Sequence, residues 1–560
     1  MRTGVNVRAV TRAGGALAFG LALCLGLMGG QASAGMPAGA PSGITAAQSS
    51  KIDARVLKDT ADGKAAEFMV VMASQADVSA GHNIKNHDER GWYVYNTLKA
   101  HAERTQSGIR SVLSASNVAH KSYWAVNALL VTGDRSVVDS VAARSDVSKI
   151  ESNRPTRWIE KPEIANETKA NVSPNAIEWG VMNVKAPEVW ALGFRGQGMV
   201  VGGLDTGIRW THNAIKNQYR GWDGVNADHN YNWWDAIHSG GGTCGPNTQA
   251  PCDDNGHGTH TVGTSVGDDG NPGPNQIGVA PAAKWIGCRN MNQGNGTPAT
   301  YTECFQFTIA PTDLAGQNAN PALRPHVLIN SWGCPVSEGC TTGEELRTIV
   351  ENTQAAGIFV QVSAGNAGPG CSSVNDAPGH YAASFSTGAI DINNTIAGFS
   401  SRGPVTLDGS GRMKPNISAP GVNVRSATRS SDTAYTSLSG TSMAGPHVSG
   451  VVALLWSARP ALVRDIAGTK NVLQNSANPA VNVPGGQTCG GIPHTQIPNN
   501  TFGYGRVDAL AAVNSVQQGT PTPTVTGTPP TATQTRTVTS TAIVTPSATR
   551  TSTSTPNPCL

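Results

Sequence analysis

Short apolar runs alternate with helical patterns through the middle of this 560-residue chain. The runs have five or six residues, which is the length of a buried strand, and the segments between them carry apolar residues at helical spacing. The predicted strands are residues 199–204, 283–288, 326–330 and 358–363. The predicted helices are residues 303–317 and 344–356, with two more that begin near residues 257 and 442. This alternation predicts an α/β domain, in which a mostly parallel sheet is covered by helices on both faces.

A smaller pattern precedes this region. Its predicted elements are a strand, a helix, a second strand, a second helix and an edge strand, at residues 67–72, 92–113, 123–131, 135–144 and 147–151. The order predicts a small α+β domain that folds separately from the α/β domain.

The two ends and one internal segment lack such patterns. Residues 1–34 have early arginines, an apolar run and small residues at the end, which is the layout of a cleavable signal peptide. Residues 161–176 are polar and contain prolines, and they predict an exposed linker that proteases reach easily. Threonine and proline dominate residues 517–560, which predict a disordered tail. The predicted domains are therefore residues 1–34, 52–160, 161–176, 177–516 and 517–560.

Composition favours an exported enzyme. The formal net charge is only +3, which does not suggest a nucleic-acid partner, and no apolar run beyond the signal peptide is long enough to span a bilayer. Nine cysteines follow the signal peptide, and an even set of eight in an exported domain predicts disulfides. Pairing near neighbours gives Cys244–Cys252, Cys288–Cys304, Cys334–Cys340 and Cys371–Cys489, with Cys559 left over.

The segment 440–448 contains the strongest chemical signal, a serine between small residues at the start of an apolar helical run. This pattern predicts that Ser442 lies at a helix N-terminus with its Oγ exposed. The helix dipole and free backbone N–H groups favour negative charge there. Because a serine hydroxyl is protonated at neutral pH, a nucleophilic Ser442 also needs a base and a group that orients the base.

Three other segments supply such groups. His257 lies near glycines, which leave its ring open to a cleft. Asp205 ends a predicted buried strand, so it would project at the carboxyl edge of the sheet. Asn366 follows another predicted strand, and its amide can donate a hydrogen bond to the oxyanion of a tetrahedral intermediate.

Taken in the order Asp, His, Asn, Ser, the four segments resemble the subtilisin-like serine peptidases, from about residue 177 to residue 513. Segments 177–180, 232–235 and 284–287 resemble the bacillopeptidase F-like branch of that family. The resemblance implies a subtilisin-like, doubly wound and mostly parallel sheet, preceded by a small ferredoxin-like inhibitory propeptide.

The resemblance also implies the roles of the residues. Asp205 would orient the imidazole, His257 would act as general base and then acid, and Ser442 would be the nucleophile. Asn366 and the Ser442 N–H would form the oxyanion hole. Together with the signal peptide, the resemblance leads us to expect a secreted, monomeric serine endopeptidase made as a precursor and inhibited by its own propeptide. The exposed linker and the triad of Asp205, His257 and Ser442 lead us to expect self-cleavage between about residues 153 and 175.

Family resemblance places the substrate on two segments. Ser331, Trp332 and Gly333 would pair their backbone with an extended peptide, and Ala364 and Gly365 would wall the primary specificity pocket. Main-chain pairing uses groups common to all peptides, so we expect broad protein substrates. Trp332 stands where many relatives carry leucine, which would alter the adjoining subsite.

No cofactor is expected to be required. Acidic pairs lie on glycine-containing loops at Asp253, Asp254, Asp268 and Asp269. We expect solvated loop charge at these positions, with calcium binding as the alternative.

Other functions compete for the same residues. An aspartic peptidase would need a second motif like that of Asp205, and the sequence has none. His257 and His260 lack the intervening glutamate of a zinc motif, so we expect His260 and His447 to be packed or capping residues. The tail leaves open an inactive, surface-attached binding protein. An acyl transferase or ligase would use the same acyl-enzyme and also stays open.

Overall fold

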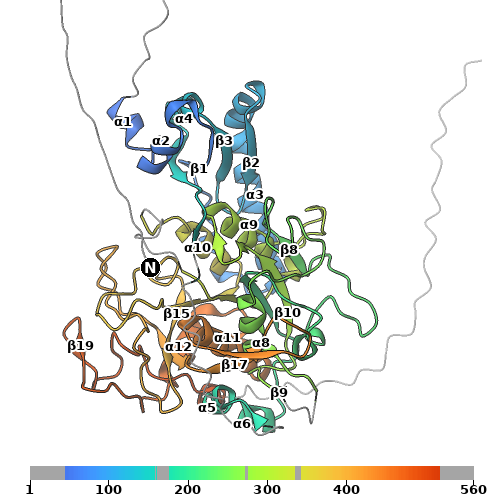
Figure 1. Cartoon of the computed structure of the whole chain (residues 1–560), viewed down its shortest axis with the longest axis vertical. Helices are drawn as coiled ribbons and strands as arrows, with labels where there is room; N and C mark the ends of the chain where they lie inside the picture. Colours follow the sequence, from blue (N-terminus) through green and yellow to red (C-terminus); the bar gives the residue numbers. More distant parts are fainter. Residues whose placement is uncertain (1–44, 158, 160–175, 271–274, 334–341, 517–560) are drawn as a thin grey trace, which may run out of the picture.

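The structure is a computed structural model that describes residues 45–157, 159, 176–270, 275–333 and 342–516. The predicted signal peptide, the tail and nearly all of the predicted linker lie outside these residues, as do Cys334, Cys340 and Cys559. Figure 1 shows a small N-terminal domain packed on one end of a larger α/β domain.

A seven-stranded sheet forms the centre of the larger domain, with the order β16-β15-β14-β13-β7-β10-β8. Every neighbouring pair runs parallel. The strands are β7 (Val200–Asp205), β8 (Trp233–Asp235), β10 (Lys284–Arg289), β13 (Val327–Asn330), β14 (Phe359–Ser363), β15 (Phe385–Ile390) and β16 (Ile417–Pro420). All residues of the last four are buried, as expected for a parallel sheet covered on both faces.

Helices cover the two faces of the sheet. On one face, α8 (His257–Val266) and α11 (Thr441–Ala458) contribute to a core that includes Val201 of β7. The other face carries α9 (Pro298–Ile309) and α10 (Arg347–Ala355), in a core that includes Leu204 of the same strand. The other helices of this domain are α5 (Trp179–Asn183), α6 (Ala186–Ala191), α7 (Asn213–Lys216), α12 (Ile466–Asn475) and α13 (Ala509–Ser515). The predicted doubly wound α/β fold is confirmed.

The prediction of a helix over residues 303–317 was wrong at both ends. Helix α9 begins at Pro298, because Thr297 caps the Thr300 N–H and a proline is well suited to the first helical position. It ends at Ile309, because Pro311 disfavours helical geometry at the residue before it.

The N-terminal domain is ferredoxin-like, with the order β1-α3-β2-β3-α4-β4, which has one strand more than the sequence predicted. Its strands are β1 (Ala66–Met72), β2 (Ala119–Tyr123), β3 (Ala128–Gly133) and β4 (Val147–Ser152). They form an antiparallel sheet in the order β2-β3-β1-β4, so β4 is an edge strand as predicted. Helices α3 (His87–Ala115) and α4 (Arg135–Ala142) contribute Ile109 and Val138 to a core shared with the sheet.

The single strand predicted over residues 123–131 is instead a hairpin. The chain turns between β2 and β3, and the Trp124 and Ala125 N–H groups donate to Gln306 Oε1 of α9, at 2.8 and 3.2 Å. The local apolar pattern of residues 123–131 favours one continuous strand. The turn within it makes contacts with Gln306, which is distant in the sequence.

The two domains meet along α9 and α10 (Figure 1). Besides the Gln306 contacts, Asn352 Nδ2 donates to the Ala125 carbonyl at 2.8 Å. Arg90 of α3 is only 5% exposed and donates to three carbonyls of the larger domain, those of Ala355, Gln354 and Arg464, at 2.7, 2.8 and 2.9 Å. The N-terminal domain is thus held at both its hairpin and the start of α3.

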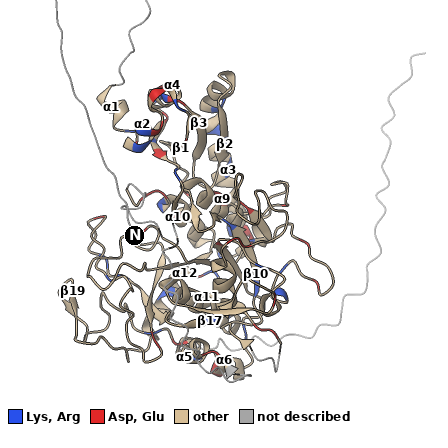
Figure 2. Ribbon diagram, viewed as in Figure 1, with Lys and Arg blue, Asp and Glu red and all other residues tan. Residues whose placement is uncertain are grey.

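Charged residues are spread over the described parts of both domains (Figure 2). No helix in the described ranges has the length and apolar character needed to cross a bilayer. Three predicted disulfides are confirmed, Cys244–Cys252, Cys288–Cys304 and Cys371–Cys489. The fourth, Cys334–Cys340, falls outside the described part of the chain.

Candidate active site

The four candidate residues lie at one edge of the central sheet. Asp205 is the last residue of β7, and Asn366 follows β14 by three residues. His257 is the first residue of α8, and Ser442 is the second residue of α11. The carboxyl ends of parallel strands face the starts of the helices that follow them, which gathers these positions at the edge where open α/β sheets bind ligands.

Asp205 and His257 form a buried pair. His257 Nδ1 lies 2.8 and 3.0 Å from the two carboxylate oxygens of Asp205, and the residues are 2% and 1% exposed. The Thr206 N–H also donates to Asp205 Oδ1, at 2.8 Å. A carboxylate at Nδ1 holds the proton there and leaves a lone pair on Nε2. His257 Nε2 has no hydrogen-bond partner among the described residues, so it is available to accept a proton.

Ser442 makes a reciprocal contact with Ser331. Ser442 Oγ donates to the Ser331 carbonyl at 2.9 Å, and Ser331 Oγ donates to the Ser442 carbonyl at 2.9 Å. The Ser442 hydroxyl must therefore turn its proton away from the Ser331 carbonyl before it can donate to His257 Nε2. Catalytic hydrogen bonds often tighten only when substrate binds.

Asn366 has a fixed amide orientation. Its Oδ1 accepts hydrogen bonds from the Thr441 N–H at 2.9 Å and from Thr441 Oγ1 at 2.8 Å, which leaves Nδ2 as the outward donor. A Cβ added at Gly440 would lie 3.8 Å from Asn366 Nδ2 and 3.6 Å from the Ser442 nitrogen. The two donors therefore approach the same small space, which a glycine keeps open. Thr441 was missed by the sequence analysis, because its only signal is its place within the 440–448 segment.

The predicted substrate-binding residues surround this space in different ways. The Trp332 side chain is 2% exposed, donates through Nε1 to the Leu204 carbonyl at 2.9 Å and packs on the Tyr301 ring. The ring is therefore packed in the core and does not line a subsite. Gly333 is the last described residue before position 342.

Ala364 and Gly365 follow β14 directly. Ala364 is buried, and Gly365 has a φ of +100°. A Cβ at Gly365 would lie 2.7 Å from Asp376 Oδ2, so this turn requires glycine.

Two further histidines are packed into the core, as expected. His260 contacts the Val424 carbonyl through Nε2 at 3.0 Å, and His447 Nδ1 donates to the Met443 carbonyl at 2.9 Å. Burial lowers the pKa of His260 to about 3 and that of His447 to about 4. Both side chains are therefore neutral in the folded protein near neutral pH.

We expect the free energy of unfolding to fall as the pH falls from 6.5 toward 4. These limits are the ordinary pKa of histidine, 6.5, and the pKa of His447 in the folded protein, about 4. In this window the unfolded chain binds a proton that the folded chain rejects, and one histidine shifted this far contributes about 3 kcal/mol. Urea unfolding at several pH values, with an inactive variant to prevent self-digestion, measures the slope. His447→Gln should make the slope shallower, and an unchanged slope would contradict the assignment.

Comparisons with known proteins agree with this geometry. Residues 196–505, more than half of the chain, match the Subtilase family. The chain belongs to the subtilase family. Its members are subtilisin-like serine endopeptidases, which are hydrolases that need no organic cofactor.

Three subtilases are similar to this chain over much of its length. The chain is 37% identical to Bacillopeptidase F of Bacillus subtilis (strain 168) over 474 residues, which are 81% of this chain and 31% of that protein. It therefore spans about a third of that relative's length. It is 30% identical to M-protease of Shouchella clausii (strain KSM-K16), covering 66% of this chain and 76% of the relative. Against Subtilisin DY of Bacillus licheniformis the identity is 33%, over 51% of this chain and 86% of the relative. The predicted bacillopeptidase F-like branch is confirmed.

Subtilases commonly bind calcium. The candidate ligands in this chain are the carboxylates of the two acidic loops, at residues 253–254 and 268–269. The expectation of solvated loop charge was wrong for Asp253 and Asp254, which are 6% and 5% exposed. Their oxygens accept hydrogen bonds from backbone N–H groups, hydroxyls and Arg289. Asp268 pairs with Arg195, and Asp269 accepts from Tyr435.

Protein donors engage Asp253, Asp254 and Asp268, and Asn275 and Tyr435 donate to Asp269 Oδ2, whereas Asp269 Oδ1 is buried without a hydrogen-bond partner among the described residues. Within the described ranges, no three His, Cys, Asp or Glu side chains are grouped so that they could hold a metal ion.

Proposed function

We propose that the chain is a secreted serine endopeptidase that acts through an acyl-enzyme on Ser442. The observation that carries the proposal is the buried Asp205–His257 pair, whose open Nε2 lies at the same sheet edge as Ser442. A base oriented by a carboxylate is what a serine hydroxyl needs to become a nucleophile.

The proposed reaction uses each group in turn. His257 Nε2 takes the proton of Ser442 Oγ as this oxygen attacks the peptide carbonyl, and Asp205 stabilises the imidazolium that forms. Asn366 Nδ2 and the Ser442 N–H donate to the oxyanion, which forms in the space beside Gly440. His257 then gives the proton to the leaving amine. Water, activated by the same histidine, hydrolyses the acyl-enzyme.

We further propose that the N-terminal domain is an inhibitory propeptide. Strand β5 (Thr156–Arg157), at the end of this domain, pairs antiparallel with β12 (Asn295–Gly296) of the larger domain. This is how an extended peptide adds to an exposed strand.

Beyond β5, Ile159 lies near the loop that precedes His257. Ile159 is 5% exposed, and a Cβ at Gly294 would lie 3.9 Å from it and 3.5 Å from Asn255, which precedes His257 by two residues. The pairing and this position support self-cleavage beyond Ile159, within the interval 153–175. The three disulfides support folding in an oxidising compartment, in keeping with secretion.

A labelling experiment tests the proposed function. The secreted protein is treated with a fluorophosphonate that reacts with activated serines, digested with trypsin and analysed by mass spectrometry. We expect label on Ser442 alone and loss of casein cleavage in proportion to labelling. Folded, processed protein that cleaves casein without label on Ser442 would refute the proposal, and product masses would separate hydrolysis from acyl transfer.

Arg90→Ala should loosen the N-terminal domain and speed activation. The substitution removes a buried cation that donates to three carbonyls across the interface. Hydrogen bonds to charged groups contribute about 1.5–3 kcal/mol, so the released domain should bind about 10-fold to 100-fold more weakly. The measurement is the lag before full casein activity. Arg110→Ala, an exposed position on the same helix, is the control, and an equal lag in both variants would contradict the role of Arg90.

A further inference from the structure

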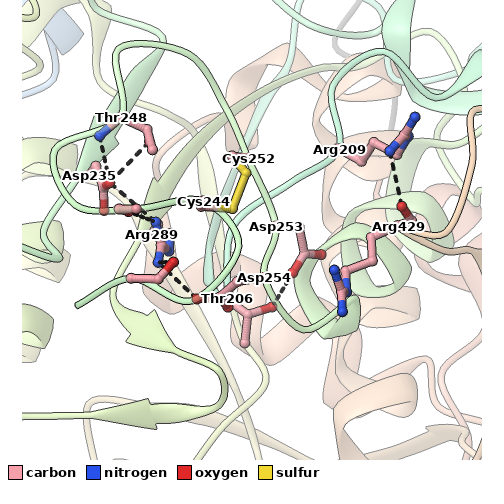
Figure 3. Close-up of a disulfide and its surroundings, with 12 residues drawn as sticks. Thr206, Arg209, Asp235, Cys244, Thr248, Cys252, Asp253, Asp254, Arg289 and Arg429 are labelled. Carbon is pink, nitrogen blue, oxygen red and sulfur yellow. Dashed lines mark hydrogen bonds and ion pairs between the residues drawn. A yellow bond between two sulfur atoms is a disulfide. The ribbon is translucent and has the colours of Figure 1, made fainter.

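A loop closed by a disulfide lies beside the Asp205–His257 pair. Cys244 and Cys252 are joined between β8 and α8, and Asp253 and Asp254 follow directly (Figure 3). We propose that Asp253 is a positioning residue for Asp205 and His257, held in place by the Cys244–Cys252 disulfide and by Arg289. The inference rests on the proposed function.

Asp253 is one of three side chains that cap the N-terminus of helix α8, together with Asn255 and Thr206. The residue at the N-cap position is Gly256, which has no side chain to satisfy the free N–H groups. Asp253 Oδ2 accepts from the Thr259 N–H at 3.0 Å and from Thr259 Oγ1 at 2.6 Å, and Oδ1 accepts from the Gly256 N–H at 2.7 Å. A carboxylate here also interacts favourably with the helix dipole. Asp253 therefore fixes the turn that carries His257.

The same carboxylate holds the end of strand β7. Thr206, the residue after Asp205, donates from Oγ1 to Asp253 Oδ1 at 2.9 Å, and Thr206 Oγ1 accepts from the Gly258 N–H at 3.0 Å. One hydrogen-bonded chain thus joins the residue after Asp205 to the residue after His257. The two backbones are close, since a Cβ at Gly258 would lie 2.1 Å from the Gly207 carbonyl oxygen.

Arg289 fastens the loop to the central sheet. It ends β10, is fully buried and lies opposite Asp205 in the strand register. Its guanidinium donates to Asp254 Oδ2 at 2.8 Å and to Asp235 Oδ2 at 3.3 Å, and also to the carbonyls of Gly241 and Gly245, at 2.8 and 2.9 Å (Figure 3). Arg289 thus pairs with Asp235, which precedes the disulfide loop in the sequence, and with Asp254, which follows it. The segment that carries Asp253 is therefore held by a strand of the sheet and by the Cys244–Cys252 disulfide.

Alignment of a carboxylate and an imidazole is sensitive to small displacements. A misplacement of about 1 Å can cost about 100-fold in rate, whereas substrate binding depends on other groups. We therefore expect Asp253→Asn to lower kcat about 10-fold to 100-fold and to leave KM nearly unchanged. The asparagine keeps the size of the side chain, but its Nδ2 cannot accept, so either the Thr259 N–H and hydroxyl or the Gly256 N–H loses its acceptor.

The full-length chain is expressed, and kcat is measured on the secreted, processed enzyme with active sites counted by fluorophosphonate titration. Asp465→Asn is the matched control, because Asp465 caps the N-terminus of α12 and has no link to the pair. Thr206→Val and Thr206→Ser provide a second route if Asp253→Asn fails to fold. The valine removes the connecting hydroxyl, and the serine restores it.

The inference predicts a kcat loss for Asp253→Asn and Thr206→Val, recovery in Thr206→Ser, and no loss in the control. The Cys244→Ala/Cys252→Ala double variant should show a smaller loss in the same direction. Asp253→Asn and Thr206→Val with wild-type kcat would overturn the inference, as would an equal loss in Asp465→Asn. A wild-type protein without activity would instead refute the proposed function.

Discussion

Replacement of Ser442 by alanine should abolish peptidase activity and leave the chain at precursor length. The alanine cannot form the acyl-enzyme, and neither Asp205 nor His257 can replace the missing oxygen. The loss of kcat should be on the order of a million-fold, the size known for removal of the subtilisin nucleophile. Casein cleavage, together with N-terminal sequencing of the secreted protein, provides the measurement.

A serine on the same helix provides the control for this experiment. Ser449 is buried in α11, and Ser449→Ala should keep both activity and processing. If Ser442→Ala lost its N-terminal domain at the wild-type rate, cleavage would have to come from another peptidase. If both wild type and variant stayed inert while folded, the inactive binding protein would be favoured.

Asn366→Ala should lower kcat about 100-fold to 1,000-fold, with a much smaller effect on KM. This range is known for the corresponding donor in subtilisin. The amide donates most strongly to the negative charge of the transition state, so its loss affects catalysis more than ground-state binding. Initial rates on a chromogenic peptide separate the two constants.

Thr441→Val gives a graded comparison for Asn366. It removes one of the two Thr441 donors that orient the amide, so its kcat loss should be smaller than that of Asn366→Ala. A raised KM with unchanged kcat in Asn366→Ala would instead place this residue in substrate binding.

Sequence patterns were sufficient for the strands and motifs whose signals are local. The apolar runs that became β7, β10, β13 and β14 stand out because both faces of a parallel sheet are buried. Strands β15 and β16 were missed, since Ser386, Thr387 and Ser418 interrupt the apolar pattern although they are fully buried. Strand β8 is too short to show any period.

Contacts between distant segments could not be predicted. Arg90 precedes the predicted helix over residues 92–113, and its buried role depends on carbonyls more than 260 positions away. Asp253 and Asp254 looked like loop charges, because composition does not reveal that Thr206 and Arg289 would meet them. Burial of a polar group depends on its partners, and those partners are set by the tertiary fold.

The Cys371–Cys489 disulfide affects what happens when the enzyme cleaves itself. A peptidase is exposed to its own activity, and solvent-accessible turns are the segments most easily cut. The bridge spans 118 residues, which include the whole of α11 and the exposed turn near Gly409. One cut anywhere within this span leaves the two fragments joined covalently, so neither fragment can diffuse away. A molecule cut once in this span would therefore separate into two fragments only after the Cys371–Cys489 disulfide is reduced.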